Sequence, residues 1–254
     1  MTLKIGIAGI SGRMGQMLTE EVTAAGAILV GGICRPGDDA KGATLFADIA
    51  ALAAACDVVI DFTHASTVVA HAAALAHTGT RWVLGTTGLA AADEAAIATA
   101  GTKIPVIAAP NFSPGVNLMF ALAERMAAAL PADAYDAEIL EMHHRQKVDA
   151  PSGTALGLGR AVAAGRGVNL QNVMVSGRDG HTGPRKDGEI GFATLRGGQI
   201  VGSHSLLFTA GSEQITLTHH AFDRRSFATG AVRAALWLEG KKPGLYNMKD
   251  VLGM

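Results

Sequence analysis

Residues 143–147 gather side chains that carry positive charge or exchange a proton. His143 and His144 are adjacent, Arg145 follows them, and Lys147 lies two positions further along the chain. A histidine with its ordinary pKa of about 6.5 can donate or accept a proton at neutral pH. A lysine supplies a compact cation, and it can donate a proton where burial lowers its pKa. The segment therefore indicates acid–base chemistry on a negatively charged ligand.

A helix start is predicted directly after this segment, at Pro151-Ser152-Gly153-Thr154. Proline suits the first turn of a helix, because its missing N–H would have no intrahelical partner there. The N–H groups of the next three residues then lie at the positive end of the helix, and Gly153 lets a ligand approach the backbone closely. The combination predicts a carboxylate site beside a proton carrier. The alternative is a capped helix with ordinary surface histidines.

The strand predicted over residues 135–144 places neighbouring side chains on opposite faces. His143 and His144 should therefore point in different directions, unless the strand ends between them. Glu141 and His143 share one face, and His219 and His220 are adjacent further on. Neither arrangement matches HExxH or a Cys/His zinc pattern, so we expect no metal site.

A glycine-rich turn near the N-terminus is typical of a phosphate-binding loop. In IGIAGISGRMG, Gly9, Gly12 and Gly15 form the spacing GxxGxxG between a predicted strand and a predicted helix. Glycines allow a tight turn and bring backbone N–H groups close to a pyrophosphate, and the positive helix end adds to the attraction. Arg13 adds a cation. Glycine-rich turns are common, so the prediction of dinucleotide binding rests on the position of this turn in a strand–helix–strand pattern.

The segment after the second predicted strand bears on the choice of coenzyme. An acidic residue there would bind the ribose 2′-hydroxyl of NADH, whereas an arginine suits the 2′-phosphate of NADPH. Cys34 and Arg35 occupy the expected place, and Asp38 and Asp39 come slightly later. Arg35 therefore favours NADPH or the use of both coenzymes. As an alternative, Arg35 is a solvated loop residue.

The first half of the chain alternates short apolar runs with alanine-rich helical stretches. Continuous β-branched runs between helices are typical of parallel strands buried on both faces. This pattern predicts an α/β fold with a Rossmann-like doubly wound parallel sheet. Strands are expected at 3–8, 28–33, 58–60, 82–84 and 106–108, and helices near 13–25, 48–54, 67–77 and 91–100.

The second half reads as a separate α+β domain. The glycine pair Gly197-Gly198 and the pair Ala210-Gly211 lie between late strands, so they predict hairpins and a mixed, mostly antiparallel sheet. The glycine-rich, charged segment 177–189 is a candidate mobile loop. A helix is expected at 114–130, a second helix from Pro151, and strands at 135–144, 173–176, 190–195, 200–209 and 214–222.

The last predicted helix, at 226–238, should return to the first domain. The expected division is therefore a dinucleotide-binding domain of residues 1–113 and 225–254 and a second domain of residues 114–224.

Composition excludes several classes of function. The chain has 254 residues, of which 49% are hydrophobic and 17% charged, so it can bury a large core. A net charge of −1 without a basic face argues against nucleic acid as a partner. Cys34 and Cys56 form no CxxC pair, which indicates a reducing compartment. Without an apolar run that spans a bilayer or a signal peptide, we expect a cytoplasmic protein with no membrane partner.

The motifs above resemble those of the 4-hydroxy-tetrahydrodipicolinate reductase family, formerly called dihydrodipicolinate reductases. The resemblance rests on EMHHRQKVDAPSGTA with GISGRMG, GTTG and APNFS, and it runs from Lys4 to Leu252. The HHRxKxDxPSGTA string is specific to this family, whereas the glycine motif is not. The resemblance implies a Rossmann coenzyme domain and a second domain that binds substrate and builds a homotetramer. It also implies reduction of a cyclic dicarboxylate by NADPH or NADH, with loss of water, in the diaminopimelate–lysine pathway.

The resemblance also implies roles for individual residues. His143 matches the family's proton donor/acceptor, and Lys147 matches its proposed proton donor. His144, Gly153 and Thr154 match substrate contacts. Arg225 matches a cationic residue near the substrate in some members. Coenzyme contacts match Gly9, Ile10, Ser11, Gly12, Arg13, Met14, Gly85, Thr86, Thr87, Ala109, Pro110, Asn111 and Phe112.

The chain departs from the family at the coenzyme-selecting loop. Some members carry an acidic residue before the arginine, where this chain has Cys34. This departure agrees with the prediction that Arg35 favours NADPH or dual use. Two other functions share the first-domain motifs: another NAD(P)-linked amino-acid or semialdehyde dehydrogenase, and a regulator that binds NAD(P) without catalysis. Neither requires HHRQK followed by PSGT.

Overall fold

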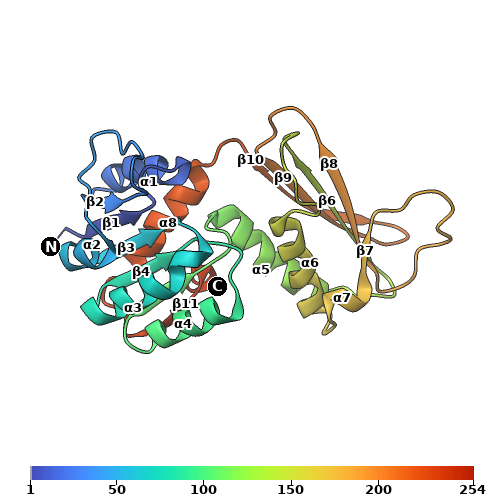
Figure 1. The fold of residues 1–254 in the computed structure, drawn as a ribbon. Coiled ribbons are helices and arrows are strands. Elements are labelled where there is room, and N and C mark those ends of the chain that lie inside the picture. Colours follow the sequence, from blue (N-terminus) through green and yellow to red (C-terminus); the bar gives the residue numbers. More distant parts are fainter. Residues whose placement is uncertain (1) are drawn as a thin grey trace. The chain divides into compact units, whose positions relative to one another are not determined.

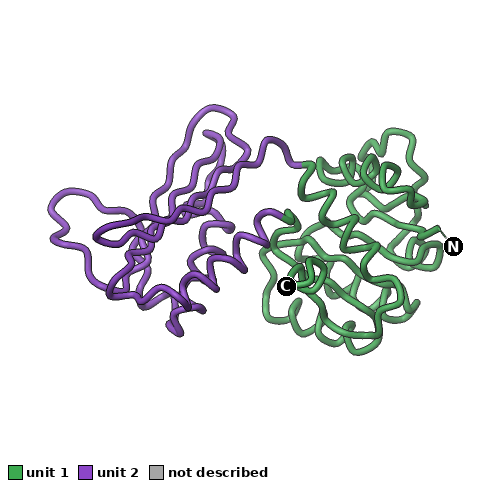
Figure 2. Tube along the Cα trace, turned by 180° about the vertical axis from the view of Figure 1, so that it is seen from behind, with its two compact units in different colours: residues 1–114, 225–254 green, residues 115–224 purple. Residues whose placement is uncertain are grey.

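The computed structural model describes residues 2–254, which form two compact units. Unit 1 comprises the chain up to Pro114 together with Arg225–Met254, and unit 2 comprises Gly115–Arg224. Figure 2 colours the two units separately. Among the described residues, no helix has the length and hydropathy needed to cross a membrane.

Unit 1 is built on a six-stranded sheet in which every neighbouring pair is parallel. The strands are β1 Lys4–Ala8, β2 Ile28–Ile33, β3 Val58–Asp61, β4 Arg81–Leu84, β5 Pro105–Ala108 and β11 Gly244–Tyr246. Their order is β2-β1-β3-β4-β5-β11. The chain runs outward from β1 to β2 and then returns to the other side of β1 with β3, so the direction of winding reverses there. The predicted doubly wound parallel sheet is confirmed (Figure 1).

Helices cover both faces of this sheet and bury two apolar cores. On one face lie α1 Arg13–Ala24 and α8 Arg225–Trp237, and on the other lie α2 Ile49–Ala55, α3 Val68–Thr78 and α4 Ala91–Gly101. Successive residues of β3 alternate between the cores, because side chains of a strand point alternately to opposite faces. Val58 and Ile60 join the core beneath α1 and α8, whereas Val59 joins the core beneath α2 and α3. Three short elements of unit 1 were not predicted: η1 Ala65–Thr67, β11 and α9 Met248–Leu252.

Unit 2 contains a five-stranded mixed sheet. Its strands are β6 Asp136–His143, β7 Met174–Ser176, β8 Ile190–Arg196, β9 Gly202–Thr209 and β10 Gln214–Ala221, in the order β10-β9-β6-β8-β7. Strand β9 pairs antiparallel with β6 and β10, but β8 pairs parallel with β6 and β7. The mixed sheet is confirmed, with antiparallel pairing along the long strands β6, β9 and β10. The hairpin expected between β8 and β9 is wrong.

The error arose at the Gly197-Gly198 turn. This turn does not close a hairpin, because β6 lies between β8 and β9. Instead, it crosses the end of β6. The Gly197 N–H donates to the His143 carbonyl, and Gly198 accepts from the Arg145 N–H. A glycine pair predicts a reversal of the chain but not whether a third strand lies between the two arms. The Ala210-Gly211 turn does close the hairpin of β9 and β10.

Helices α5 Pro114–Ala129 and α6 Gly153–Gly165 pack on one face of the unit 2 sheet, and the short α7 Leu170–Val173 follows them. Strand β6 alternates strictly between half-buried and buried residues. Its buried face carries Ala137 and Ile139 and then Glu141 and His143. The apolar core therefore gives way to ionisable side chains at the end of β6.

The glycine-rich segment 177–189 is held at both ends by ion pairs. Arg178 binds Glu138 and Glu189, and Arg185 binds Asp136 and Glu138. These contacts attach the segment to the start of β6, on the strand that also carries His143.

Candidate active site

Unit 1 has a cleft of about 900 Å³ at the carboxyl ends of β1, β2 and β3. Ligands of doubly wound sheets bind where the strand order reverses, which here is between β1 and β3. Three segments line the cleft: Gly9, Ser11 and Gly12 after β1; residues 33–36 with Asp38 and Asp39 after β2; and residues 62–64 with Ser66, Thr67 and His71 after β3.

The glycine turn is shaped for close approach of a phosphate. Gly9 has a φ of +87°, and a Cβ at Gly15 would lie 2.2 Å from the Gly9 carbonyl oxygen. Helix α1 begins at Gly12, its N-cap, without a side-chain cap or an acidic residue in its first turn. The first turn of α1 therefore contributes no carboxylate of its own that would compete for these N–H groups. These features fit the pyrophosphate of a dinucleotide.

The coenzyme-selecting loop brings two opposite charges to the cleft. Arg35 is 88% exposed and forms an ion pair of 3.3 Å with Asp38. Asp38 also accepts a hydrogen bond of 2.9 Å from the Ser11 hydroxyl, within the glycine turn. This bond, with help from Arg35, holds the pKa of Asp38 below its ordinary value. The sequence interpretation placed Asp38 slightly later than the expected position, yet the loop folds back and returns it to the turn.

A buried carboxylate–histidine pair borders the same cleft. Asp61 is 0% exposed at the end of β3, and its Oδ2 lies 2.7 Å from Nδ1 of His71. Its Oδ1 accepts from the Thr63 N–H at 3.1 Å and from the Thr63 hydroxyl at 2.6 Å. The pair thus fixes the backbone that follows β3. Sequence interpretation did not single out His71, although its position in α3 after Asp61-Phe62-Thr63 offered a signal.

The other predicted coenzyme residues follow β1, β4 and β5. Ile10 and Phe112 are buried in the core beneath α1 and α8, so only their backbones remain to meet a ligand. The Thr86 hydroxyl is buried and has no hydrogen-bond partner within residues 2–254. Arg13, Met14, Gly85, Thr87, Ala109, Pro110 and Asn111 are not among the residues that line the cleft.

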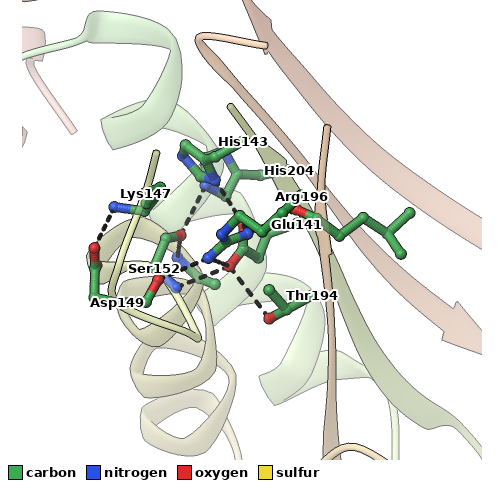
Figure 3. Close-up of polar contacts among 10 residues, drawn as sticks. Glu141, His143, Lys147, Asp149, Ser152, Thr194, Arg196 and His204 are labelled. Carbon is green, nitrogen blue, oxygen red and sulfur yellow. Dashed lines mark hydrogen bonds and ion pairs between the residues drawn. The ribbon is translucent and has the colours of Figure 1, made fainter. Parts of the chain in front are cut away.

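In unit 2, the end of β6 meets the start of α6 through one carboxylate (Figure 3). Glu141 is 1% exposed, and its Oε2 lies 2.6 Å from Nδ1 of His143. Its Oε1 accepts from the Ser152 N–H at 3.0 Å. Arg196 of β8 donates to both oxygens, each at 2.9 Å. Burial alone would raise the pKa of Glu141, but the bonds from Arg196 and His143 outweigh this effect and lower it.

These contacts correct one expectation about the helix start. Helix α6 begins at Gly153, and Ser152 is its N-cap, with a hydroxyl that accepts from the Ala155 N–H. Pro151 therefore precedes the cap and is not in the first turn. The Ser152 N–H already donates to Glu141. At Gly153 an added Cβ would meet nothing within 4 Å, so the helix start is open for a ligand at that position.

Two histidines lie against each other at this end of the sheet. His143 and His204 of β9 have ring centroids 5.0 Å apart at an interplanar angle of 71°. Burial lowers the pKa of His204 to about 4, and the neighbouring His143 contributes to this shift. Burial also lowers the pKa of His143, although Glu141 opposes that effect. At neutral pH His204 is therefore uncharged, and it hydrogen-bonds the Ser152 hydroxyl at 3.1 Å.

The remaining predicted substrate residues have varied surroundings. Lys147 forms an ion pair of 2.8 Å with Asp149, and Nδ1 of His144 is buried without a hydrogen-bond partner among residues 2–254. Thr154 is half-buried in the first turn of α6. Arg225 belongs to unit 1, where it begins α8 and binds Glu20 and Glu21 of α1. Its role in binding substrate stays a prediction.

Sequence interpretation missed Arg196, His204 and Thr194, which come from β8 and β9 and lie more than fifty positions from β6. Within residues 2–254, no three His, Cys, Asp or Glu side chains are grouped as metal ligands would be.

Comparison with known proteins places both units in one family. The family model "Dihydrodipicolinate reductase, N-terminus" matches residues 3–112, and "Dihydrodipicolinate reductase, C-terminus" matches residues 115–252. A 4-hydroxy-tetrahydrodipicolinate reductase of Acidiphilium cryptum is 65% identical over 252 residues, which is 99% of this chain and 98% of the relative. The enzyme of the same name from Granulibacter bethesdensis is 63% identical over 256 residues, covering 100% of this chain and 98% of the relative.

Solved structures agree with these matches. A dipicolinate-bound dihydrodipicolinate reductase from Paenisporosarcina sp. TG-14 superimposes with a TM-score of 0.81 at 26% identity, covering 97% of this chain and 98% of that one. A probable dehydrogenase from Thermotoga maritima, at 11% identity and a TM-score of 0.63, shares the fold alone. The chain therefore belongs to the dihydrodipicolinate reductase family of oxidoreductases, and its activity is the reduction of 4-hydroxy-tetrahydrodipicolinate.

Proposed function

We propose that His143 is the proton donor of this reduction and that the start of α6 binds a carboxylate of the substrate. NADPH or NADH, held by the cleft of unit 1, would supply the hydride. The observation that carries the proposal is the pairing of His143 with Glu141 beside the open helix start at Gly153. Nδ1 of His143 is occupied by a carboxylate that also binds the N-cap of α6, which leaves Nε2 for the substrate.

The proton has a definite route in this arrangement. Hydride addition at carbon 4 of a conjugated ring leaves enamine character, so carbon 3 must gain a proton. His143 donates that proton from Nε2 and keeps the proton on Nδ1 for Glu141. Solvent then restores the Nε2 proton. A well-placed acid of this kind contributes a factor of roughly 10²–10⁴ in rate.

Each carboxylate of the substrate has a proposed partner. One meets the backbone N–H groups of Gly153 and Thr154, because a helix N-terminus attracts anions. The other meets the cationic or protonatable groups of His144, Lys147 or Arg225. Lys147 either anchors this carboxylate or assists the departure of water. The similar reductase from Paenisporosarcina holds dipicolinate, an aromatic dicarboxylate, and this supports a dicarboxylate site in the present chain.

We further propose that the cleft accepts both NADPH and NADH. Arg35 would bind the 2′-phosphate of NADPH, and Asp38 would bind the 2′-hydroxyl of NADH. The two side chains already form an ion pair beside the glycine turn. A phosphate would therefore draw Arg35 away from Asp38, whereas a hydroxyl would leave the ion pair in place.

The test is NADPH consumption with freshly generated condensation product of aspartate semialdehyde and pyruvate. Wild-type protein should oxidise NADPH, and the His143→Ala variant should lose nearly all of this activity while it still binds NADPH. His77→Asn is the matched control, because His77 is exposed on α3 of unit 1. Activity of His143→Ala close to that of His77→Asn would refute the proposed role of His143.

We propose, finally, a cytoplasmic homotetramer. The free thiols of Cys34 and Cys56 suit a reducing compartment. The face of the unit 2 sheet opposite α6 has no helix over it within the described chain, and Leu195 there is 52% exposed. Further copies of the chain would cover this face. Analytical ultracentrifugation should give a mass four times that of the chain, and a monomeric mass would refute the tetramer.

A further inference from the structure

Glu141 has no unused hydrogen-bonding capacity. Its two oxygens accept from His143, from both terminal nitrogens of Arg196, and from the Ser152 N–H, at 2.6–3.0 Å. The Thr194 hydroxyl adds a fifth contact at 3.2 Å. An ionised carboxylate offers about four lone-pair sites, so this set saturates it. Strands β6 and β8 and one helix start thus converge on a single side chain that is 1% exposed.

A contribution to fold stability does not explain why a buried charge occupies this position. Removing a carboxylate and a guanidinium from water is costly, and well-packed apolar side chains of similar volume often replace such a pair without loss of stability. Ala137 and Ile139 show that the same face of β6 is apolar where it only packs against α6. The change to Glu141 occurs two residues before His143, where a fixed negative charge can act on the imidazole.

The opposite edge of the His143 ring is kept clear. A Cβ at Gly202 would lie 3.1 Å from Nε2 of His143, so any larger residue there would crowd this nitrogen. The backbone at Gly202 is not in the left-handed region, so the lack of a side chain gives clearance, not conformational freedom. Glu141 therefore binds the Nδ1 edge of the ring, and Gly202 leaves space at the Nε2 edge.

We propose that Glu141 is the positioning residue of His143. It holds the proton on Nδ1, directs Nε2 toward the substrate, and stabilises the imidazolium from which the substrate is protonated. Arg196 keeps Glu141 ionised and oriented, and the Ser152 N–H joins the same carboxylate to the helix start that would bind the substrate. This inference rests on the proposed role of His143 as proton donor.

The charges around His143 fix the expected direction of a pH effect. Glu141 on β6 is the negative group in contact with the ring, whereas Arg196 on β8 and Lys147 on the loop after β6 are positive. His204 on β9 is uncharged at neutral pH, because burial lowers its pKa to about 4. Loss of the Glu141 charge would therefore lower the pKa of His143. As the pH rises, His143 would then lose its donor proton at a lower pH than it does in the wild-type protein.

The test compares Glu141→Gln with Glu138→Gln. Glu138 is the matched control, since it lies on the same strand and also pairs with arginine, through Arg178 and Arg185, but contacts no residue of the site. Glu141→Gln should lower kcat at least tenfold, since loss of an orienting carboxylate costs up to about 10⁴ in related histidine systems. The alkaline limb of the pH profile of kcat/KM should also move to lower pH in Glu141→Gln, while Glu138→Gln keeps the wild-type profile. An unmoved limb in a folded Glu141→Gln protein that binds NADPH would overturn the inference.

A second measurement is made on the wild-type protein, and the His143→Asn variant serves there only to assign the resonance. In wild-type protein with isotope-labelled histidine, nitrogen NMR should show neutral His143 with its proton on Nδ1. A dominant Nε2–H tautomer would overturn the inference even if Glu141→Gln failed to fold. His143→Asn separates the two levels of the argument. Full activity in His143→Asn would refute the proton donor itself, whereas an inactive His143→Asn with a normal Glu141→Gln would refute only the positioning role.

Discussion

Within residues 2–254, each unit contains a buried carboxylate–histidine pair, and the two pairs have similar central geometry. In unit 1, Asp61 Oδ2 lies 2.7 Å from Nδ1 of His71. In unit 2, Glu141 Oε2 lies 2.6 Å from Nδ1 of His143. Their other partners differ. Asp61 accepts from the backbone and hydroxyl of its neighbour Thr63, whereas Glu141 accepts from an arginine and from a helix start.

The difference shows that the partners of the other carboxylate oxygen, the one not bonded to the histidine, indicate the function of each pair. Neutral partners two residues away stabilise a local turn, so the Asp61–His71 pair shapes the wall of the coenzyme cleft. A guanidinium and a helix N-terminus hold a charge in place, so the Glu141–His143 pair can respond when the substrate changes protonation. We therefore expect the first pair to act on coenzyme binding and the second pair on the rate of reduction.

The largest expected effect comes from His143→Asn. At saturating substrate and coenzyme, kcat should fall by roughly 10²–10⁴, the contribution of a well-placed general acid. KM for the substrate should change far less, because the helix start at Gly153 is untouched. Steady-state kinetics with the condensation product measures both values. A kcat within a few-fold of wild type would make the two pairs equivalent and remove the proposed distinction.

The His71→Asn variant should show the opposite pattern. Loss of a buried hydrogen bond to a carboxylate costs about 1.5–3 kcal/mol, part of which will appear as a looser wall of the coenzyme cleft. The dissociation constant of NADPH should rise about tenfold, and kcat at saturating coenzyme should stay near the wild-type value. Fluorescence titration of NADPH gives the first quantity. If kcat fell as far as in His143→Asn while NADPH bound normally, the assignment of the pairs would be reversed.

The sequence predicts the two pairs unequally, for physical reasons. The motif HHRQK before PSGT indicates His143 and the helix start, because both lie in one continuous segment. The glycine turn at Gly9 and Gly12 is local in the same way. Glu141 was seen to share a face with His143, but its significance depends on Arg196, which is 55 positions away. Such a contact follows from strand order, which the sequence predicted incorrectly at Gly197-Gly198.

The same limit applies in unit 1. His71 was not singled out, because helical spacing alone does not reveal which face of a helix meets the end of a strand. The contact of Asp38 with the glycine turn was not predicted, because the path of a loop cannot be read from its length. The sheet itself was predictable, since parallel strands buried on both faces need continuous apolar runs.

A smaller effect is expected at the coenzyme-selecting loop. Arg35→Ala should weaken NADPH binding several-fold and leave NADH binding unchanged, because an exposed ion pair contributes about 1 kcal/mol or less. Asp38→Asn is the matched variant, and it should weaken NADH while NADPH binding is retained or improved. Competitive titrations of both coenzymes measure these shifts. Parallel losses for NADH and NADPH in Arg35→Ala would contradict a role in reading the 2′-phosphate.

The smallest expected effect is a difference between two pH profiles of the wild-type protein. Burial lowers the pKa of His143 in the free protein, so the alkaline limb of kcat/KM should lie below the ordinary histidine range. Two substrate carboxylates favour the imidazolium, so the alkaline limb of kcat should lie at higher pH, by about one unit or less. Coincident limbs would mean that the substrate carboxylates do not approach His143.

The most direct test of the distinction between the pairs is a titration of isotope-labelled histidine with dipicolinate, followed by NMR. The resonances of His143 and His71 can be assigned from the His143→Asn and His71→Asn variants. Dipicolinate should shift the His143 resonance and raise the pKa of that imidazole, while the His71 resonance moves only when NADPH is added. A dipicolinate response at His71 with His143 unmoved would contradict the account.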